Sequence, residues 1–105
     1  MMVTQKNFKQ QVIDSNSLSL VQFKTEWNGA SQILEMIYND LTKSYSGVVN
    51  FHTVDFEGEP ALAKEYGVME IPTILFFKDG KLIDHVVGMI PKHQLVLKIE
   101  TALMK

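Results

Sequence analysis

Residues 66–88, YGVMEIPTILFFKDGKLIDHVVG, contain the pattern that decides the fold. The run TILFFK at residues 73–78 combines β-branched, leucine and aromatic residues, and it predicts a strand. Asp79-Gly80 follows, a dipeptide typical of tight β-hairpins, and LIDHVV at residues 82–87 predicts the antiparallel partner strand. The stretch therefore predicts a β-hairpin in the second half of the chain.

Upstream of this hairpin, strand-like and helix-like patterns alternate. Thr4 is a favoured helix N-cap residue, and the apolar residues after it predict a short first helix. Residues 18–24, LSLVQFK, are apolar on both faces, which is typical of a buried parallel strand. Residues 31–46 show an apolar stripe at helical spacing and predict the longest helix. Residues 48–56, VVNFHTVDF, predict a second strand by their β-branched and aromatic content.

Two prolines mark the starts of the remaining helices. Pro60 begins a short helix that Gly67 ends, and Pro91 begins the terminal helix. Met2–Val3 could add a short extra strand. The order helix, strand, helix, strand, helix, strand, strand, helix predicts an α/β fold with a central mixed sheet of four to five strands. Four helices would flank this sheet and cover both of its faces.

Composition limits both the architecture and the classes of function. The chain has 105 residues, 46% of them hydrophobic, which suits one domain spanning residues 1–105. All ten basic residues are lysines and the net charge is -2, so we expect no nucleic-acid binding, for which arginine and excess positive charge are typical. No run approaches the ~18 apolar residues of a membrane span, and the start lacks a signal-peptide pattern. These features predict a cytoplasmic protein that does not bind membranes.

The chain contains no cysteine. Disulfides, thiolate metal ligands and cysteine nucleophiles are therefore excluded. The histidines His52, His85 and His93 show no helical pairing with another histidine or glutamate, so no metal site is expected. No glycine-rich loop suited to phosphate binding is present, and we expect no cofactor.

Two motifs and the order of the elements resemble the thioredoxin family. The run SLVQFKTEWNGASQI at residues 19–33 resembles the family's strand, tryptophan and active-site turn. Residues 66–88 resemble its second half: the tyrosine-glycine turn, the isoleucine-proline-threonine before the next strand, the hairpin and the closing glycine. The resemblance covers almost the whole chain and implies a thioredoxin-like fold.

The active-site turn departs from the family pattern. The family reads Trp-Cys-Gly-Pro-Cys-Lys, whereas residues 27–32 read Trp-Asn-Gly-Ala-Ser-Gln. The two cysteine positions fall on Asn28 and Ser31, the family's buried acid falls on Gln22, and its neighbouring lysine falls on Thr53. Disulfide exchange needs a thiolate, a second thiol and a proton acceptor, so these departures imply that the catalytic residues are absent and that the protein is no disulfide oxidoreductase.

The resemblance also implies a surface for non-covalent binding. Members of the family bind extended peptides beside a cis-proline, which here is Pro72, and the backbone of the residue before it pairs with the peptide. The surface implied by the resemblance consists of Trp27, Gly29, Ala30, Ile71, Pro72, Gly88 and Met89. We therefore expect a redox-inactive protein that binds a protein or an extended peptide segment through the Trp27 and Ile71-Pro72 loops.

Several alternatives stay open at this stage. The protein could be an accessory in a thiol–disulfide and redox-homeostasis pathway in which a partner supplies the cysteine chemistry. The patch around Trp27 could form a homodimer, or Trp27 could simply cover the edge of the core. Asn28 and Ser31 are favoured helix N-cap residues, and capping is the role expected for both. A hydrolase with Ser31 as nucleophile is the least favoured alternative, because it needs a positioned base and an oxyanion hole.

Overall fold

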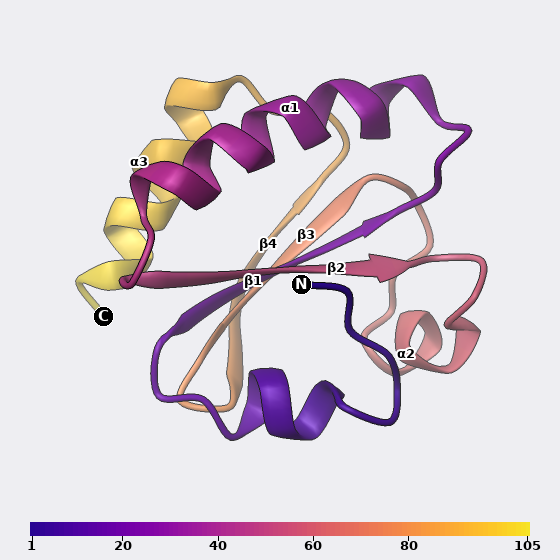
Figure 1. The fold of residues 1–105 in the computed structure, drawn as a ribbon, viewed down its shortest axis with the longest axis horizontal. Coiled ribbons are helices and arrows are strands. Elements are labelled where there is room, and N and C mark those ends of the chain that lie inside the picture. Colours follow the sequence, from indigo (N-terminus) through magenta and orange to yellow (C-terminus); the bar gives the residue numbers. More distant parts are fainter.

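The computed structural model describes all residues from 1 to 105 as a four-stranded sheet with helices on both faces (Figure 1). The strands are β1 (Leu18–Lys24), β2 (Val49–Asp55), β3 (Thr73–Lys78) and β4 (Lys81–Val87). The helices are η1 (Lys9–Ile13), a short π-helix, α1 (Gly29–Ser44), α2 (Pro60–Glu65) and α3 (Lys92–Leu103). The expected α/β class, with a mixed sheet and four helices, is confirmed.

The sheet has the order β2-β1-β3-β4. β1 and β2 are parallel and are joined by a crossover through α1, whereas β3 pairs antiparallel with both β1 and β4. Asp79 and Gly80 in the β3–β4 turn both have positive φ, 53° and 77°, as expected for a hairpin of this composition. A Cβ on Gly80 would lie 2.9 Å from the carbonyl oxygen of Ile13, so glycine is also required by the available space.

The N-terminal segment differs from the sequence-based prediction. Thr4 does not cap a helix, because its N–H donates to Asn7 Oδ1 at 2.8 Å and closes a separate turn before η1 begins. The extra strand at Met2–Val3 is only a single bridge between Met2 and Thr53. The sheet therefore has four strands, with the first residues lying along its β2 edge.

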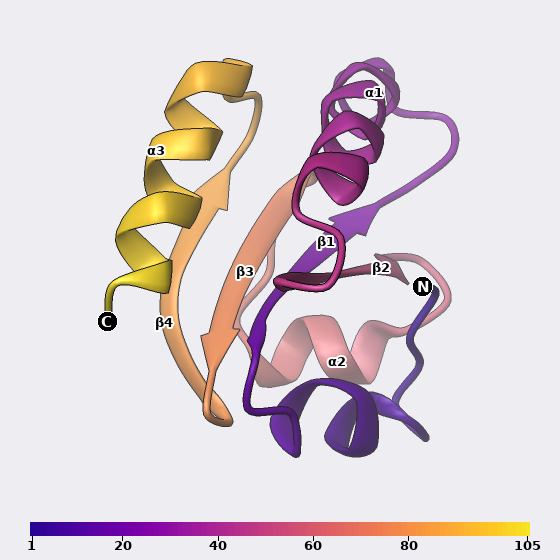
Figure 2. The same cartoon turned by 60° about the vertical axis from the view of Figure 1, so that its left-hand side comes forward.

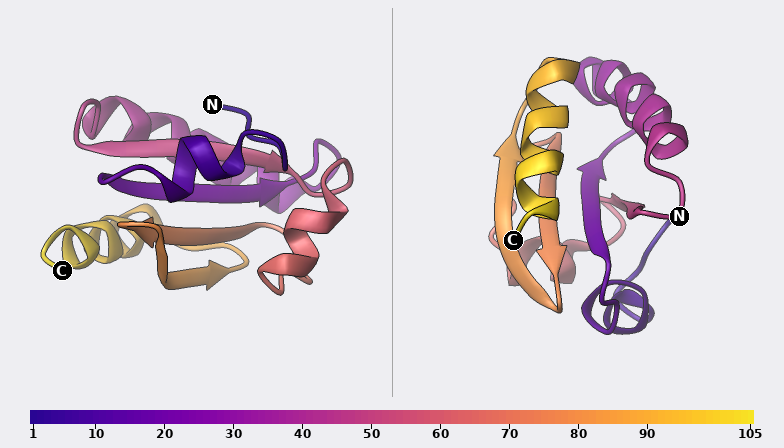
Figure 3. Two further views of the ribbon diagram at one scale, coloured as in Figure 1. Left: turned by 90° about the horizontal axis from the view of Figure 1, so that it is seen from below. Right: turned by 90° about the vertical axis from the view of Figure 1, so that its left-hand side faces the viewer.

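Alternating residues of the strands face two separate cores. Figures 2 and 3 show from different sides that α1 and α3 cover one face of the sheet, and that α2 and the N-terminal helix cover the other. On one face, Leu20 and Phe76 pack with residues of α1 and α3. On the other face, Val21 and Phe23 pack with residues of η1 and α2. Removal of these apolar side chains from water is the main stabilising contribution. None of the helices has both the length and the apolar character that crossing a bilayer requires.

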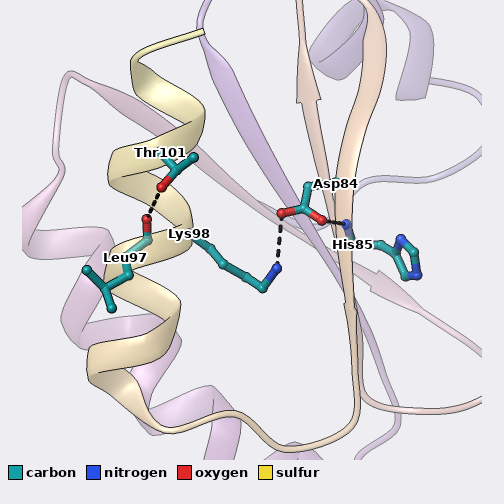
Figure 4. A network of polar contacts seen from close by, with 5 residues as sticks. All are labelled: Asp84, His85, Leu97, Lys98 and Thr101. Atoms are coloured by element: carbon teal, nitrogen blue, oxygen red, sulfur yellow. Dashed lines mark hydrogen bonds and ion pairs between the residues drawn. The ribbon is translucent and has the colours of Figure 1, made fainter.

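Polar interactions, among them those of Tyr38 and Lys98, attach the helices of this first face, α1 and α3, to the sheet. The Tyr38 hydroxyl in α1 hydrogen-bonds to the carbonyl oxygens of Leu20 and His52, at 2.8 and 2.6 Å. In Figure 4, Lys98 of α3 reaches Asp84 of β4, at 3.1 Å. Burial alone would raise the pKa of Asp84, but the backbone N–H of His85 and the Lys98 ammonium outweigh it and lower the pKa. These contacts fix α1 and α3 against the sheet.

Four loops meet at one edge of the sheet. Phe23 near the end of β1 is in register with Val54 of β2 and with Thr73 at the start of β3, and Thr73 pairs with Val87 at the end of β4. The ends of β1, β2 and β4 and the start of β3 therefore lie at the same edge (Figure 1). We call this the loop edge, and its loops are residues 25–28, 56–59, 66–72 and 88–91.

Candidate binding site at the loop edge

The turn that carries Trp27 is held by two hydrogen bonds. Asn28 is the N-cap of α1, and its Oδ1 accepts from the Ser31 N–H at 2.8 Å. The Gln32 side chain donates to the Glu26 carbonyl oxygen at 2.7 Å. The capping role expected for Asn28 is confirmed. The same role expected for Ser31 is wrong, because Ser31 lies inside the first turn of α1 and supplies only the backbone N–H.

Trp27 lies on this well-fixed turn and is 88% exposed. The alternative that Trp27 covers the edge of the core is therefore wrong. Trp27 is exposed because the chain leaves the sheet after the buried Thr25, just past the end of β1, and crosses a short loop before α1 begins. A large aromatic side chain in water on a fixed turn is available for contact with another molecule.

The two positions that the resemblance assigns to the family's acid and lysine lie side by side in the sheet. Gln22 and Thr53 are register partners on β1 and β2. Gln22 is fully buried, and neither atom of its amide has a hydrogen-bond partner in the protein. The Ser31 hydroxyl is equally buried and also has no partner. The first face of the sheet thus holds the neutral polar side chains of Gln22 and Thr53 at the positions where the family has a carboxylate and a lysine.

The loop before β3 is joined to the loop after β4. The Ile71–Pro72 peptide bond is cis. The Pro72 carbonyl oxygen accepts from the Gly88 N–H at 2.7 Å, and Gly88 has a φ of 83°, which favours glycine. The Thr73 hydroxyl donates to the carbonyl oxygen of Glu70 at 2.6 Å. These bonds fix the backbone on both sides of Pro72.

The residues predicted for partner binding all come from loops or the helix start at the loop edge, but they differ in accessibility. Trp27, Gly29 and Met89 are exposed, whereas Ala30, Ile71 and Gly88 are partly buried and Pro72 is buried. Pro72 and Gly88 are directly hydrogen-bonded. The buried Pro72 acts on this edge through its backbone, not through an exposed ring.

A hollow of about 440 Å³ lies beside Trp27. We call it the Trp27 hollow; its lining residues are Met2, Lys24, Thr25, Glu26, Trp27, Asp55 and Glu57. Sequence reasoning missed this acidic lining, because Glu26 and Asp55 come from segments far apart in the chain. The parallel register places Asp55 directly opposite Lys24 and so brings the β2 end to Trp27.

A second hollow is lined in part by residues that flank Ile71 and Pro72 in the chain. It has a volume of about 650 Å³, and its lining residues are Tyr66, Gly67, Val68, Met69, Glu70, Thr73, Leu75, Leu82, His85 and Val87. Met69 is 87% exposed, and Leu82 and Val87 are about half exposed. Neither hollow is lined by Ile71 or Pro72, whereas Trp27, which belongs to the predicted patch, lines the Trp27 hollow.

The arrangement gives no support to a hydrolase. Ser31 Oγ forms no hydrogen bond, and no group of three or more histidine, aspartate and glutamate side chains lies close enough to hold a metal ion. His52 belongs to the opposite face of β2 from Phe51, which packs with α1. Its imidazole is buried without a partner, and burial, aided by the positive amino terminus, lowers its pKa to about 4. The sheet separates this base from Ser31.

The mixed sheet, the crossover through α1 and the loop edge define an α/β protein with a thioredoxin-like fold. The family model described as thioredoxin matches residues 1–101. The chain is 35% identical over 98 residues to Thioredoxin 1 of Nostoc sp., covering 93% of this chain and 92% of that protein. It is 37% identical over 90 residues to Thioredoxin 1 of Synechococcus elongatus, covering 86% and 84%. The chain belongs to the thioredoxin family.

A similar match to the thioredoxin of Chlorobaculum thiosulfatiphilum, 34% identical over 97 residues, covers 92% of this chain and 90% of that protein. These matches include both the turn at residues 27–32 and the Ile71–Pro72 loop within their span of nearly the whole chain. The chain thus belongs to the thioredoxin family although it contains no cysteine.

Proposed function

We propose that this member of the thioredoxin family is redox-inactive and acts by non-covalent binding of a protein or extended peptide segment. The contacts are made by the Trp27 and Ile71–Pro72 loops at the loop edge. The observation that carries the proposal is the 88% exposure of Trp27 on a capped, fixed turn in a chain without cysteine. Asn28, Ser31, Gln22 and Thr53 have structural roles only.

The absent thiols support the redox-inactive part of the proposal. In thiol–disulfide exchange a thiolate attacks a disulfide sulfur, and its formation is favoured by the free N–H groups at a helix N-terminus. At the start of α1 the Asn28 amide occupies this place and accepts the Ser31 N–H. An amide neither attacks sulfur nor carries electrons, so the helix start is stabilised but has no exchange chemistry.

The exposure of apolar side chains supports the binding part. Trp27, Met69 and Met89 are exposed by 88%, 87% and 48% in loops of the loop edge. Aromatic residues and methionine are enriched in protein interfaces, and tryptophan is among the residues that dominate binding energy. The Ile71 backbone next to the start of β3 would add strand-like pairing with an extended segment.

The test uses a binding partner captured from the native host and then purified. Trp27→Ala and Ile71→Asp should each weaken its affinity by roughly tenfold or more, because truncation of an interface hot spot costs about 2 kcal/mol. Matched controls are Met104→Ala and Leu97→Asp, which alter exposed apolar residues on or after α3. Calorimetric titration that gives unchanged affinity for both loop variants contradicts the proposal.

Family membership favours a second candidate, an accessory in a thiol–disulfide pathway in which the partner supplies the cysteines. This function needs the same surface but a particular class of partner. A purified partner with a reactive cysteine pair, whose exchange rate changes on addition of this chain, would favour it. A partner without cysteine would favour the general binding function.

A further inference from the structure

We propose that the Trp27 hollow binds a lysine or arginine side chain of an extended partner segment, with the cation stacked on Trp27 and surrounded by Glu26, Asp55 and Glu57. The inference rests on the proposed binding function and names the chemistry of the partner. Its occupant is a cationic peptide, in contrast to a second copy of this chain or an apolar peptide.

The first observation is the charge of the hollow. Glu26, Asp55 and Glu57 are exposed, and none of their carboxylates takes part in an ion pair or a side-chain hydrogen bond. The one lysine of the lining, Lys24, has its Nζ 2.7 Å from Glu35 Oε1, with only 17% of the lysine side chain exposed. The hollow therefore keeps an uncompensated negative charge that a cation of a partner would complement.

The second observation is the charge of the whole loop edge. Its loops, residues 25–28, 56–59, 66–72 and 88–91, contain four acidic residues and no lysine, although the chain has ten lysines. The acidic residues of the loops are Glu26, Glu57, Glu59 and Glu70. A basic segment that crosses this edge meets no like charge in the loops, and its approach is steered by the combined field.

The third observation is the aromatic ring at the hollow. Trp27 lines the concavity and is 88% exposed, so its indole face is not used within the fold. Tryptophan is the best aromatic partner for a cation, and arginine stacks on its face more often than lysine does. This chain has no arginine that could take that place. The ring and the carboxylates together form a complementary site for a side chain with an apolar stem and a cationic end.

Three blocked peptides that differ at one residue test the inference: Ac-Ser-Val-Thr-Xaa-Val-Thr-Ser-NH2, with arginine, citrulline or glutamate at Xaa. Citrulline keeps the shape of arginine and removes its charge. Trp27 is the chain's only tryptophan, so its fluorescence reports on the hollow, and heteronuclear NMR locates the perturbed amides. We expect the arginine peptide to bind about fivefold to tenfold more tightly than the citrulline peptide and to weaken between about 20 and 300 mM NaCl.

The decisive variant combines Glu26→Gln, Asp55→Asn and Glu57→Gln. It should bind the arginine peptide about tenfold more weakly and should lose the preference for arginine over citrulline. The matched control, Asp14→Asn with Asp40→Asn and Asp79→Asn, changes the net charge equally at exposed sites outside the loop edge and should bind as the parent does.

Three results overturn the inference. The first is equal affinity of the arginine and citrulline peptides, and the second is no perturbation of Trp27 by either peptide. The third is burial of Trp27 at high protein concentration in the absence of peptide. That result would assign the hollow to contact with a second copy of the chain. Equal affinity that is lost in Ile71→Asp would overturn the cationic preference while supporting the proposed function. The affinities of Ile71→Asp and Trp27→Ala for the native partner test the proposed function separately.

Discussion

Gln22 is the residue whose environment departs most from the family's redox chemistry. It is fully buried in β1, and its amide has no hydrogen-bond partner in the protein. A buried neutral amide without a partner costs about 1–3 kcal/mol, whereas an ionised carboxylate in the same place costs considerably more. At this buried position, the neutral glutamine therefore destabilises the fold less than an ionised carboxylate would.

Gln22→Asp should therefore destabilise the protein at neutral pH, by about 2 kcal/mol or more. Burial raises the pKa of the new carboxyl above that in the unfolded chain, so the destabilisation is largest above that pKa and shrinks as the pH falls. Urea midpoints at pH 7 and pH 5 measure both effects. Gln22→Leu is the control, because it removes the amide and the charge together and should match or exceed the parent's stability. A midpoint for Gln22→Asp at or above the parent's at pH 7 contradicts the prediction.

At the scale of elements, the sequence predicted strands better than helix starts. The strands at residues 18–24 and 73–78 have the predicted bounds, because turn residues flank their apolar runs. The helix predicted at residues 31–46 begins at Gly29, because its first turn carries no buried apolar side chain that the periodicity could reveal. The start of the N-terminal helix differs from the prediction for another reason. Asn7 closes a turn in a segment that the sequence pattern predicts as helix.

The start of α1 gives a prediction at the same scale. The double variant Asn28→Cys, Ser31→Cys places two thiols in the first turn of α1, three residues apart, as in the family's active-site turn. We expect them to form a disulfide, but to reduce insulin with dithiothreitol at least about tenfold more slowly than a quadruple variant that also carries Gln22→Asp and Thr53→Lys. The reason is that Gln22 accepts no proton from the buried second thiol.

The quadruple variant serves as the comparison because Gln22 and Thr53 are register partners and are changed as a pair. Thiol titration before and after oxidation confirms that both variants form the disulfide to the same extent. Equal turnover of the double and quadruple variants would show that the acid and the lysine contribute nothing to disulfide exchange at these two thiols.

For the whole molecule, the sequence predicted the layers but not the Trp27 hollow. The apolar residues on both faces of β1, the β-branched and aromatic content of β3 and the apolar stripe of α1 are local patterns, so they indicate a sheet covered on both faces. The hollow depends on which residues of β1 and β2 lie opposite one another, as Lys24 and Asp55 do, and on the pairing of Lys24 with Glu35. Neither follows from spacing along the chain. The orphaned Gln22 amide is likewise a property of the packed interior.

His52 affects the stability of the whole molecule because it is buried without a hydrogen-bond partner. Burial, with a smaller effect of the positive amino terminus, lowers its pKa to about 4 in the folded protein. The unfolded chain, in which histidine titrates near ~6.5, therefore binds more protons between these two values. The free energy of unfolding should rise with pH across this window and fall as the protein is acidified.

We expect the parent to lose up to about 2 kcal/mol more stability than His52→Leu between pH 7 and pH 5. Other titrating groups are common to both proteins, so the difference isolates this imidazole. His93→Gln, which removes an exposed histidine of α3, should follow the parent. Urea unfolding at half-unit pH intervals gives the two curves. Parallel curves for the parent and His52→Leu would mean that His52 keeps its ordinary pKa in the folded protein, which contradicts the prediction.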